Sequence, residues 1–221
     1  MEQRFLLAMV ANSLFLNSAS AEEGKFPYAD EELIGFYQLE TCATGHDWGI
    51  DDENNSLGIY FHKSIEISKN NRFRINYIFF YDAHCSKPKV AGLWDGHYVL
   101  GEAHPRLPHT RLGDFTIDRV QLAIMDGRLM EATRGCGVGR WMVGLFNDIT
   151  ETGCTALGPL FLPTSVMKTD YDIVHLHDGV FKSGFRTPDM AADAMGRPTA
   201  LQDRVPLVRQ QTTNPGEMDG E

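Results

Sequence analysis

Apolar and polar residues alternate along several short stretches of the chain, which is the pattern of a strand with one buried face. The clearest stretch covers residues 72–81, where every second residue from Phe73 to Tyr81 is apolar. Another alternating stretch, 59–67, precedes it, and Asn70-Asn71 between them is a turn signal, so the two stretches predict a hairpin. Further strands are predicted at 90–100, 114–125, 128–133, 141–145, 170–177 and 180–185.

Glycine-containing turns separate these strands, and long stretches of helical periodicity are absent. Asp126-Gly127 and Asp178-Gly179 are typical hairpin turns. Short helices are predicted near residues 30–34 and within residues 188–195. Several short strands at close spacing with such turns predict an all-β domain, either an antiparallel sandwich or a barrel with short peripheral helices.

The N-terminal residues are typical of an exported protein. Residues 1–21 read as a signal peptide, because an apolar stretch follows Arg4 and ends in the small-residue site Ala19-Ser20-Ala21. The alternative interpretation is an amphipathic helix of a cytosolic protein. No apolar run reaches the ~18 residues of a membrane-spanning helix, so no integral membrane segment is predicted. We therefore expect a secreted or periplasmic protein.

The remainder of the chain predicts one domain followed by a tail. Residues 22–208 show neither an internal repeat nor a domain boundary. The chain becomes polar after Thr187, and residues 209–221 are predicted to be disordered. Val205 to Val208 are expected to add at most a short edge strand.

The cysteines agree with export, since their number is even and disulfides form in oxidising compartments. Four cysteines allow three connectivities, and pairing of nearest neighbours predicts Cys42–Cys85 and Cys136–Cys154. No Cys-x-x-Cys pair occurs, which argues against zinc and thioredoxin-like sites. Four buried free thiols are the alternative.

Charge and motifs narrow the function classes. Asp and Glu outnumber Lys and Arg by 30 to 20, for a net charge of −10, whereas a nucleic-acid-binding surface is basic. The chain contains neither a Gly-x-Ser-x-Gly elbow nor a His-Glu-x-x-His motif. We therefore expect no nucleic-acid partner, no catalytic residues and no cofactor.

One pair of histidines keeps an enzymatic alternative open. His175 and His177 lie two residues apart on a predicted strand and so share a face, and Asp170 and Asp172 are expected on that same face. Such a set is half of a metal site, and it would suit an exported metal-dependent hydrolase. Spacing fixes no third ligand, so no metal site is assigned.

The surroundings of the cysteines resemble a known family. The motifs occur in order along residues 33–208: Phe80-Tyr81 before Cys85-Ser86-Lys87-Pro88, Gly96-His97-Tyr98, Gly135-Cys136-Gly137, Trp141 to Gly144, Asp148-Ile149-Thr150, Gly153-Cys154 to Gly158, Leu162-Pro163, Tyr171 to Ile173, Arg197-Pro198 and Val205 to Val208. Together they resemble the repeated domain of the adenomatosis polyposis coli down-regulated proteins, which are secreted or membrane-tethered inhibitors of Wnt signalling.

This resemblance implies an antiparallel β-barrel-like domain with an apolar pocket for a lipid or acyl chain. Eight inward-facing residues are the candidates to line that pocket: Phe73, Tyr77, Phe79, Trp94, Tyr98, Phe115, Trp141 and Val143. Ordinary core packing is the alternative role for each of them.

The sequence also departs from the family. Members that act on Wnt carry two such domains and a membrane segment, whereas one domain and a polar tail are predicted here. The early Gly-x-Trp of the family is Gly35-Phe36-Tyr37 in this chain. We therefore expect a non-enzymatic module whose partner is a lipid, an acyl chain or a lipidated protein. A structural protein-binding domain without a ligand is the alternative, and association into a homodimer stays open.

Overall fold

The structure is a computed structural model that describes residues 26–45, 60–157, 159–186 and 193–211. The predicted signal peptide, residues 1–21, and the last ten residues of the predicted tail lie outside the described residues. The described chain is all-β, as the alternating pattern predicts, with a few short helices.

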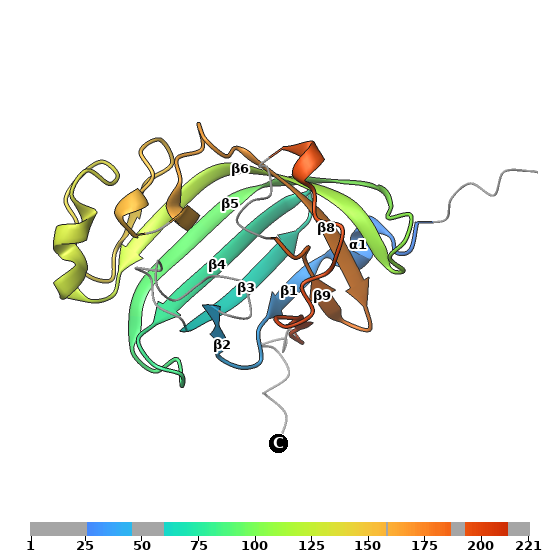
Figure 1. Ribbon diagram of the computed structural model, residues 1–221, viewed down its shortest axis with the longest axis horizontal. Coiled ribbons are helices and arrows are strands. Elements are labelled where there is room, and N and C mark those ends of the chain that lie inside the picture. The colour runs from blue at the N-terminus through green and yellow to red at the C-terminus, as the bar shows by residue number, and fades with distance from the viewer. Residues whose placement is uncertain (1–25, 46–59, 158, 187–192, 212–221) are drawn as a thin grey trace, which may run out of the picture.

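A closed antiparallel barrel of eight strands forms the body of the molecule (Figure 1). In ring order the strands are β1 (Gly35–Gln38), β10 (Leu207–Arg209), β9 (Val180–Lys182), β8 (Thr169–His177), β6 (Thr110–Ile124), β5 (Pro88–Ala103), β4 (Arg72–Phe80) and β3 (Tyr60–Ser68). Pairing of β3 with β1 closes the ring. Two short strands outside the ring, β2 (Ala43–Thr44) and β7 (Phe146–Asp148), pair with β3 and β6.

The predicted hairpin is confirmed in β3 and β4. The two strands pair in unbroken register from Tyr60 opposite Phe80 to Ser68 opposite Arg72. Asn70 and Asn71 in the turn both have positive φ, 62° and 56°. Two consecutive residues of this kind belong to the tight hairpin turn whose twist matches that of the flanking strands, and asparagine tolerates that conformation.

The strand near the C-terminus has a larger role than expected. β10 is not an edge strand, because it pairs with β1 on one side and with β9 on the other. Leu207 lies opposite Phe181, and Arg209 lies opposite Tyr37. Without this segment the ring would be open between β9 and β1.

Two predicted strands are wrong. Residues 128–133 belong to the 3₁₀ helix η3 (Gly127–Thr133), because the Asp126 carboxylate accepts a hydrogen bond from the Arg128 amide and caps a helix start instead of a hairpin turn. Residues 141–145 form a turn that precedes β7, with the Leu145 amide donating to the Met142 carbonyl. The helices η4 (Thr155–Leu157) and η5 (Pro159–Phe161) follow, and this region covers one end of the barrel (Figure 1).

The N-terminal segment closes the other end, where the predicted helix is present as α1 (Asp30–Leu33) (Figure 1). Leu33 is fully buried, and the Tyr28 hydroxyl donates to the Val174 carbonyl at 2.8 Å. The Arg111 side chain is only 4% exposed, and it pairs with the Asp30 carboxylate at 2.5 Å. A short 3₁₀ helix, η6 (Ala194–Gly196), lies at the end of the second predicted helical region, most of which is outside the described residues.

Both predicted disulfides are confirmed, Cys42–Cys85 and Cys136–Cys154. The first ties the segment after β1 to the β4–β5 turn, and the second ties the segment after η3 to the residue that precedes η4. Both bonds are compatible with an extracellular or periplasmic protein. Among the described helices, none is long and apolar enough to cross a membrane.

Candidate functional site

Most of the predicted pocket residues lie together in the barrel interior. β4 supplies Phe73, Tyr77 and Phe79, β5 supplies Trp94 and Tyr98, and β6 supplies Phe115. All six are buried, with exposed fractions between 2% and 7%. The alternation of each strand is the reason, because it sends every second side chain to the inside.

These rings contact one another along the barrel. The edge of one ring meets the face of the other between Tyr77 and Trp94, at a centroid distance of 5.5 Å, and between Phe73 and Phe115, at 5.3 Å. Tyr77 also lies nearly parallel to Phe79, at 6.0 Å. The interior is therefore a continuous aromatic surface built from several strands.

Two further aromatic residues belong to this surface. Phe61 on β3 lies 6.1 Å from Tyr77, and its place in the alternating stretch 59–67 is a signal that identifies it. Phe161 in η5 is fully buried and stacks on Trp94 at 5.5 Å. It sits outside any alternating stretch, so periodicity gives no signal for it.

Trp141 and Val143 do not line the interior, and their assignment is corrected. Val143 is 52% exposed, in the turn that replaces the expected strand. Trp141 is partly buried against the outside of the core, and its indole N–H donates to the Cys136 carbonyl at 3.0 Å. Without a strand at 141–145, no alternation directs these side chains inward.

Ionisable groups also face the interior. Lys63 lies in the middle of β3, directly opposite Tyr77 in the β3–β4 ladder, and its ammonium is 5.4 Å from the centre of the Tyr77 ring. Asp172 on β8 is opposite Gly113 of β6, whose backbone faces inward toward the Phe115 ring. Lys63 is 7% exposed and Asp172 is 8% exposed. Ionisable side chains in an otherwise apolar interior are costly to bury in their charged forms, so these two residues are functional candidates.

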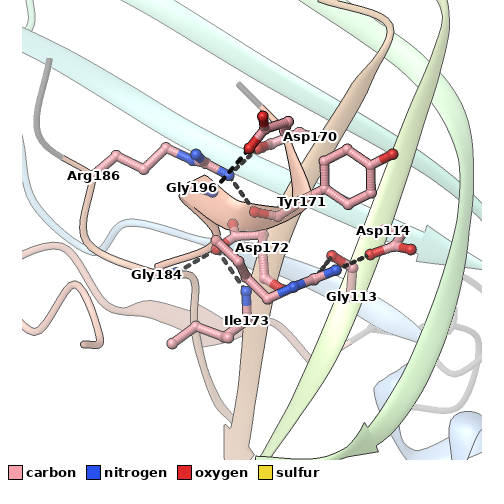
Figure 2. A network of polar contacts seen from close by, with 11 residues as sticks. Gly113, Asp114, Asp170, Tyr171, Asp172, Ile173, Gly184, Arg186 and Gly196 are labelled. Carbon is pink, nitrogen blue, oxygen red and sulfur yellow. Dashed lines mark hydrogen bonds and ion pairs between the residues drawn. The ribbon is translucent and has the colours of Figure 1, made fainter. Parts of the chain in front are cut away.

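Hydrogen-bond donors surround the two aspartates of β8, Asp170 and Asp172. One oxygen of Asp172 accepts from the backbone amides of Ile173 at 2.7 Å and Gly184 at 2.8 Å. The Arg186 guanidinium pairs with Asp170 at 2.5 Å, and Figure 2 shows these groups directed at one another. The segment after β9 therefore folds back over this part of β8.

Burial shifts the pKa of each of these interior groups. It raises the pKa of Asp172 to about 7, with the neighbouring Asp170 acting in the same direction and the two backbone amides opposing it. Burial lowers the pKa of Lys63, against the attraction of Asp172 and Asp170. Burial also raises the pKa of Tyr77 well above its usual value. Desolvation is thus the largest influence on all three groups.

A small accessible area remains around these groups. Lys63, Tyr77, Trp94 and Ile117 are each 7% exposed, whereas Phe161 at the capped end is fully buried. On β8, exposure rises from 8% for Asp172 to 35% for the Asp170 side chain. Asp170 therefore lies nearer to solvent than Asp172 does.

The histidine pair lies on the outside of the barrel. His175 and His177 are separated from the inward residues Asp172 and Val174 by an odd number of positions, so the expectation that Asp170 and Asp172 share their face is wrong. His177 instead stacks on His109, with ring centroids 3.9 Å apart. In the described ranges no group of three His, Cys, Asp or Glu side chains is placed to hold a metal ion.

His109 and His177 border an open groove. The groove encloses about 520 Å³ and is also lined by Tyr28, Glu32 and Arg209. Burial lowers the pKa of His175, although it is close enough to the Pro108 carbonyl, 3.2 Å, for a hydrogen bond.

No protein-family model matches the chain, and no curated protein matches it.

Proposed function

We propose that this protein is a non-enzymatic binding module that holds the acyl chain of a lipid inside its barrel. The observation that carries the proposal is the interior itself, in which a continuous aromatic surface surrounds a few ionisable groups with residual solvent access. Sites for apolar ligands combine these two features, since the apolar wall provides affinity and a few polar groups fix orientation.

The energetics are sufficient for a single chain. An eight-stranded barrel has an interior just wide enough for its side chains or one small ligand. Each methylene group removed from water contributes about 0.8 kcal/mol, so a chain of ~10 methylenes offsets the entropy cost of binding. A ligand of this shape would lie along the rings of Tyr77, Phe79 and Trp94.

The predicted export of the chain and its resemblance to the Wnt-inhibitor domains also support this proposal. The two disulfides favour an oxidising compartment, and the signal peptide predicted at residues 1–21 would lead the chain there. The ordered motifs that resemble the Wnt-inhibitor domains also imply lipid binding, so the ligand is a free lipid or the acyl group of a lipidated protein.

The direct test is mass spectrometry of the protein purified from its native compartment, first under native and then under denaturing conditions. We expect a stoichiometric lipid that is released only on denaturation. A protein that is empty and takes up no fluorescent fatty acid would overturn the proposal and leave a structural or protein-binding domain.

A second test locates the ligand. The chain has three tryptophans, and Trp48 lies outside the described residues. In a Trp48→Phe background, a brominated fatty acid should quench the fluorescence of Trp94, because bromine quenches on close approach. The matched variants are Trp141→Phe, which should keep the quenching, and Trp94→Phe, which should lose it. Quenching carried by Trp141 would place the ligand outside the barrel.

A further inference from the structure

Exposed apolar side chains are concentrated in one loop region of the chain. Of the twelve large hydrophobic side chains that are exposed in the described part of the chain, six belong to residues 125–146. Single apolar residues are normal on a protein surface, whereas a group of them marks an interaction site. The six are Met125, Val138, Met142, Val143, Leu145 and Phe146, with exposed fractions between 37% and 77%.

The turn that carries four of them is held in place by its backbone. The Gly144 amide donates to the Ile124 carbonyl at 2.8 Å, which ties the turn to the end of β6. The Leu145 amide donates to the Met142 carbonyl at 3.2 Å. Each of the four side chains is about half exposed on this fixed backbone, and we call them the apolar tip: Met142, Val143, Leu145 and Phe146.

The apolar tip belongs to a segment at one end of the molecule. Figure 1 shows residues 127–146, in yellow-green, at the left end of the longest axis, beyond the end of β6. A site at the end of an elongated body can meet a flat surface while the rest of the protein stays away from it. The position of the tip therefore suits contact with a surface.

The charge around the apolar tip differs from that of the whole chain. The net charge of the chain is −10, yet no acidic residue occurs between Glu131 and Asp148. This stretch contains two exposed arginines, Arg134, which pairs with Glu131 at 3.0 Å, and Arg140, which lies within ion-pair distance of none of the carboxylates that the structure describes. The two other acidic residues that border the stretch also pair with arginines, Asp126 with Arg128 and Asp148 with Arg119. The positive charge of Arg140 thus stands beside the tip, where anionic groups of a partner would balance it.

The size of the site favours a lipid surface over a protein partner. A stable protein interface takes about 20–30 residues and ~800 Å² from each partner, whereas the apolar tip is four residues of a single turn. A bilayer requires no such area, because side chains that enter its interface are surrounded by lipid. Apolar side chains next to arginines are the composition of segments that bind at this interface.

We propose that the apolar tip inserts into the interfacial region of a phospholipid bilayer, with Arg140 binding the anionic head groups. A guanidinium suits this role because it forms paired hydrogen bonds with phosphate oxygens. The inference goes beyond acyl-chain binding and does not depend on it, since insertion uses the outer surface and leaves the barrel interior unchanged.

The experiment measures cosedimentation of the protein, purified from its native compartment, with two kinds of vesicle: phosphatidylcholine alone, and phosphatidylcholine mixed with phosphatidylglycerol. The wild-type protein should bind both and prefer the anionic vesicles. Met142→Glu and Leu145→Glu should each lower the partition coefficient about tenfold, because each places a charge in the interface instead of an apolar group. Arg140→Gln should lower the affinity for the anionic vesicles about fivefold and leave binding to phosphatidylcholine unchanged.

Met195→Glu is the matched control, because it makes the same substitution as Met142→Glu at a methionine outside the tip. Met195 lies in η6 and is 91% exposed. This variant should bind both kinds of vesicle as the wild type does. Thermal unfolding verifies that all variants are folded, and the midpoints should match that of the wild type because each replaced side chain is exposed.

Several results would overturn the proposal. They are a wild-type protein that binds neither kind of vesicle, undiminished binding by folded Met142→Glu and Leu145→Glu, and an equal loss of binding in Met195→Glu. If the wild type is a dimer in sedimentation without vesicles, and the two tip variants dissociate it, the tip is an interface between two copies of this chain. Equal binding to both kinds of vesicle, with no effect of Arg140→Gln, overturns the role of the arginine. Uptake of a fluorescent fatty acid should be the same in the tip variants and the wild type, which separates this proposal from acyl-chain binding.

Discussion

The Phe161 ring stacks on the indole of Trp94, with centroids 5.5 Å apart and an angle of 15° between the planes. Trp94 belongs to a long strand, whereas Phe161 belongs to a three-residue helix in the region that covers one end of the barrel. The same contact fixes Gly92 on β5, since a Cβ atom there would lie 2.5 Å from Trp94 and 2.7 Å from Phe161. A short irregular segment therefore completes the core that the strands begin.

Phe161→Ala should lower the free energy of unfolding by about 3–5 kcal/mol, because it leaves a cavity beside the Trp94 indole. Val166→Ala is the control, since Val166 is 62% exposed and its truncation should change stability by no more than about 0.5 kcal/mol. Urea unfolding followed by tryptophan fluorescence measures both. Equal, small effects would show that η5 does not contribute to the core.

Regular alternation made much of this fold predictable. Residues 72–81 and the Asn70-Asn71 turn were sufficient for the β3–β4 hairpin, because each side chain on one face meets the core. Phe161 gave no such signal, since a single aromatic residue in a 3₁₀ turn has no period. Asp126-Gly127 was misleading, because the same two residues that suit a hairpin turn also suit a helix start when the aspartate caps the next amide.

The role of β10 in closing the ring has little signal in the sequence. The three residues of β10, Leu207–Arg209, lie in a polar region and are too few for a strong pattern. Their importance comes from partners far away in the sequence, β1 and β9, which flank them on both sides. Pairing of this kind is a property of the whole ring.

Leu207→Ala should therefore destabilise the protein by about 2–5 kcal/mol, as expected for a fully buried leucine. Val208→Ala is the matched control, because Val208 is the next residue of the same strand and is only partly buried. Thermal unfolding should separate the two variants clearly. If both lose the same stability, the inward direction of Leu207 is wrong.

The two disulfides should contribute different amounts to the free energy of unfolding. Removal of Cys42–Cys85 by a double alanine substitution should cost roughly 4 kcal/mol, and removal of Cys136–Cys154 roughly 3 kcal/mol, since the separations are 43 and 18 residues and the longer loop loses more entropy when it is closed.

Hydrogen exchange distinguishes the two removals. Loss of Cys136–Cys154 should raise exchange in η3 and η4 and leave the β3–β4 hairpin protected, because that bond lies within the covering region. Increased exchange in β3 and β4 would contradict this local role.

The candidate site was predictable only in its apolar part. Strand alternation directed Phe73, Tyr77 and Phe79 inward, whereas Lys63 occupies an inward position of β3 that the same pattern reserves for apolar residues. The placement of Asp172 depends on strict counting along β8, which separates it from His175 and His177. Lys63 and Asp172 lie on β3 and β8, on opposite sides of the ring. This arrangement follows from the strand order, which a local sequence pattern does not reveal.

Asp172 should make the stability depend on pH. Its pKa is about 7 in the folded protein, above the value near 4 of an exposed aspartate, so the folded state binds the proton more tightly. Its contribution to stability is complete below about pH 4 and is lost as the pH rises through 7, with a slope of at most about 1.4 kcal/mol per pH unit. Asp170, Arg186, Lys63 and Tyr77 are the charged and titratable groups that act on it.

The Asp172→Asn variant isolates this contribution, because the asparagine oxygen still accepts from Ile173 and Gly184 but carries no titrating proton. Between pH 4 and pH 7, the free energy of unfolding should fall less for Asp172→Asn than for the wild type. At pH 8 the variant should be the more stable of the two proteins. Asp203→Asn, at a side chain that is 71% exposed, is the control and should follow the wild-type curve. Parallel curves for the wild type and Asp172→Asn would mean that the carboxyl is ionised throughout this range, and the interior would then hold a permanent negative charge opposite Lys63.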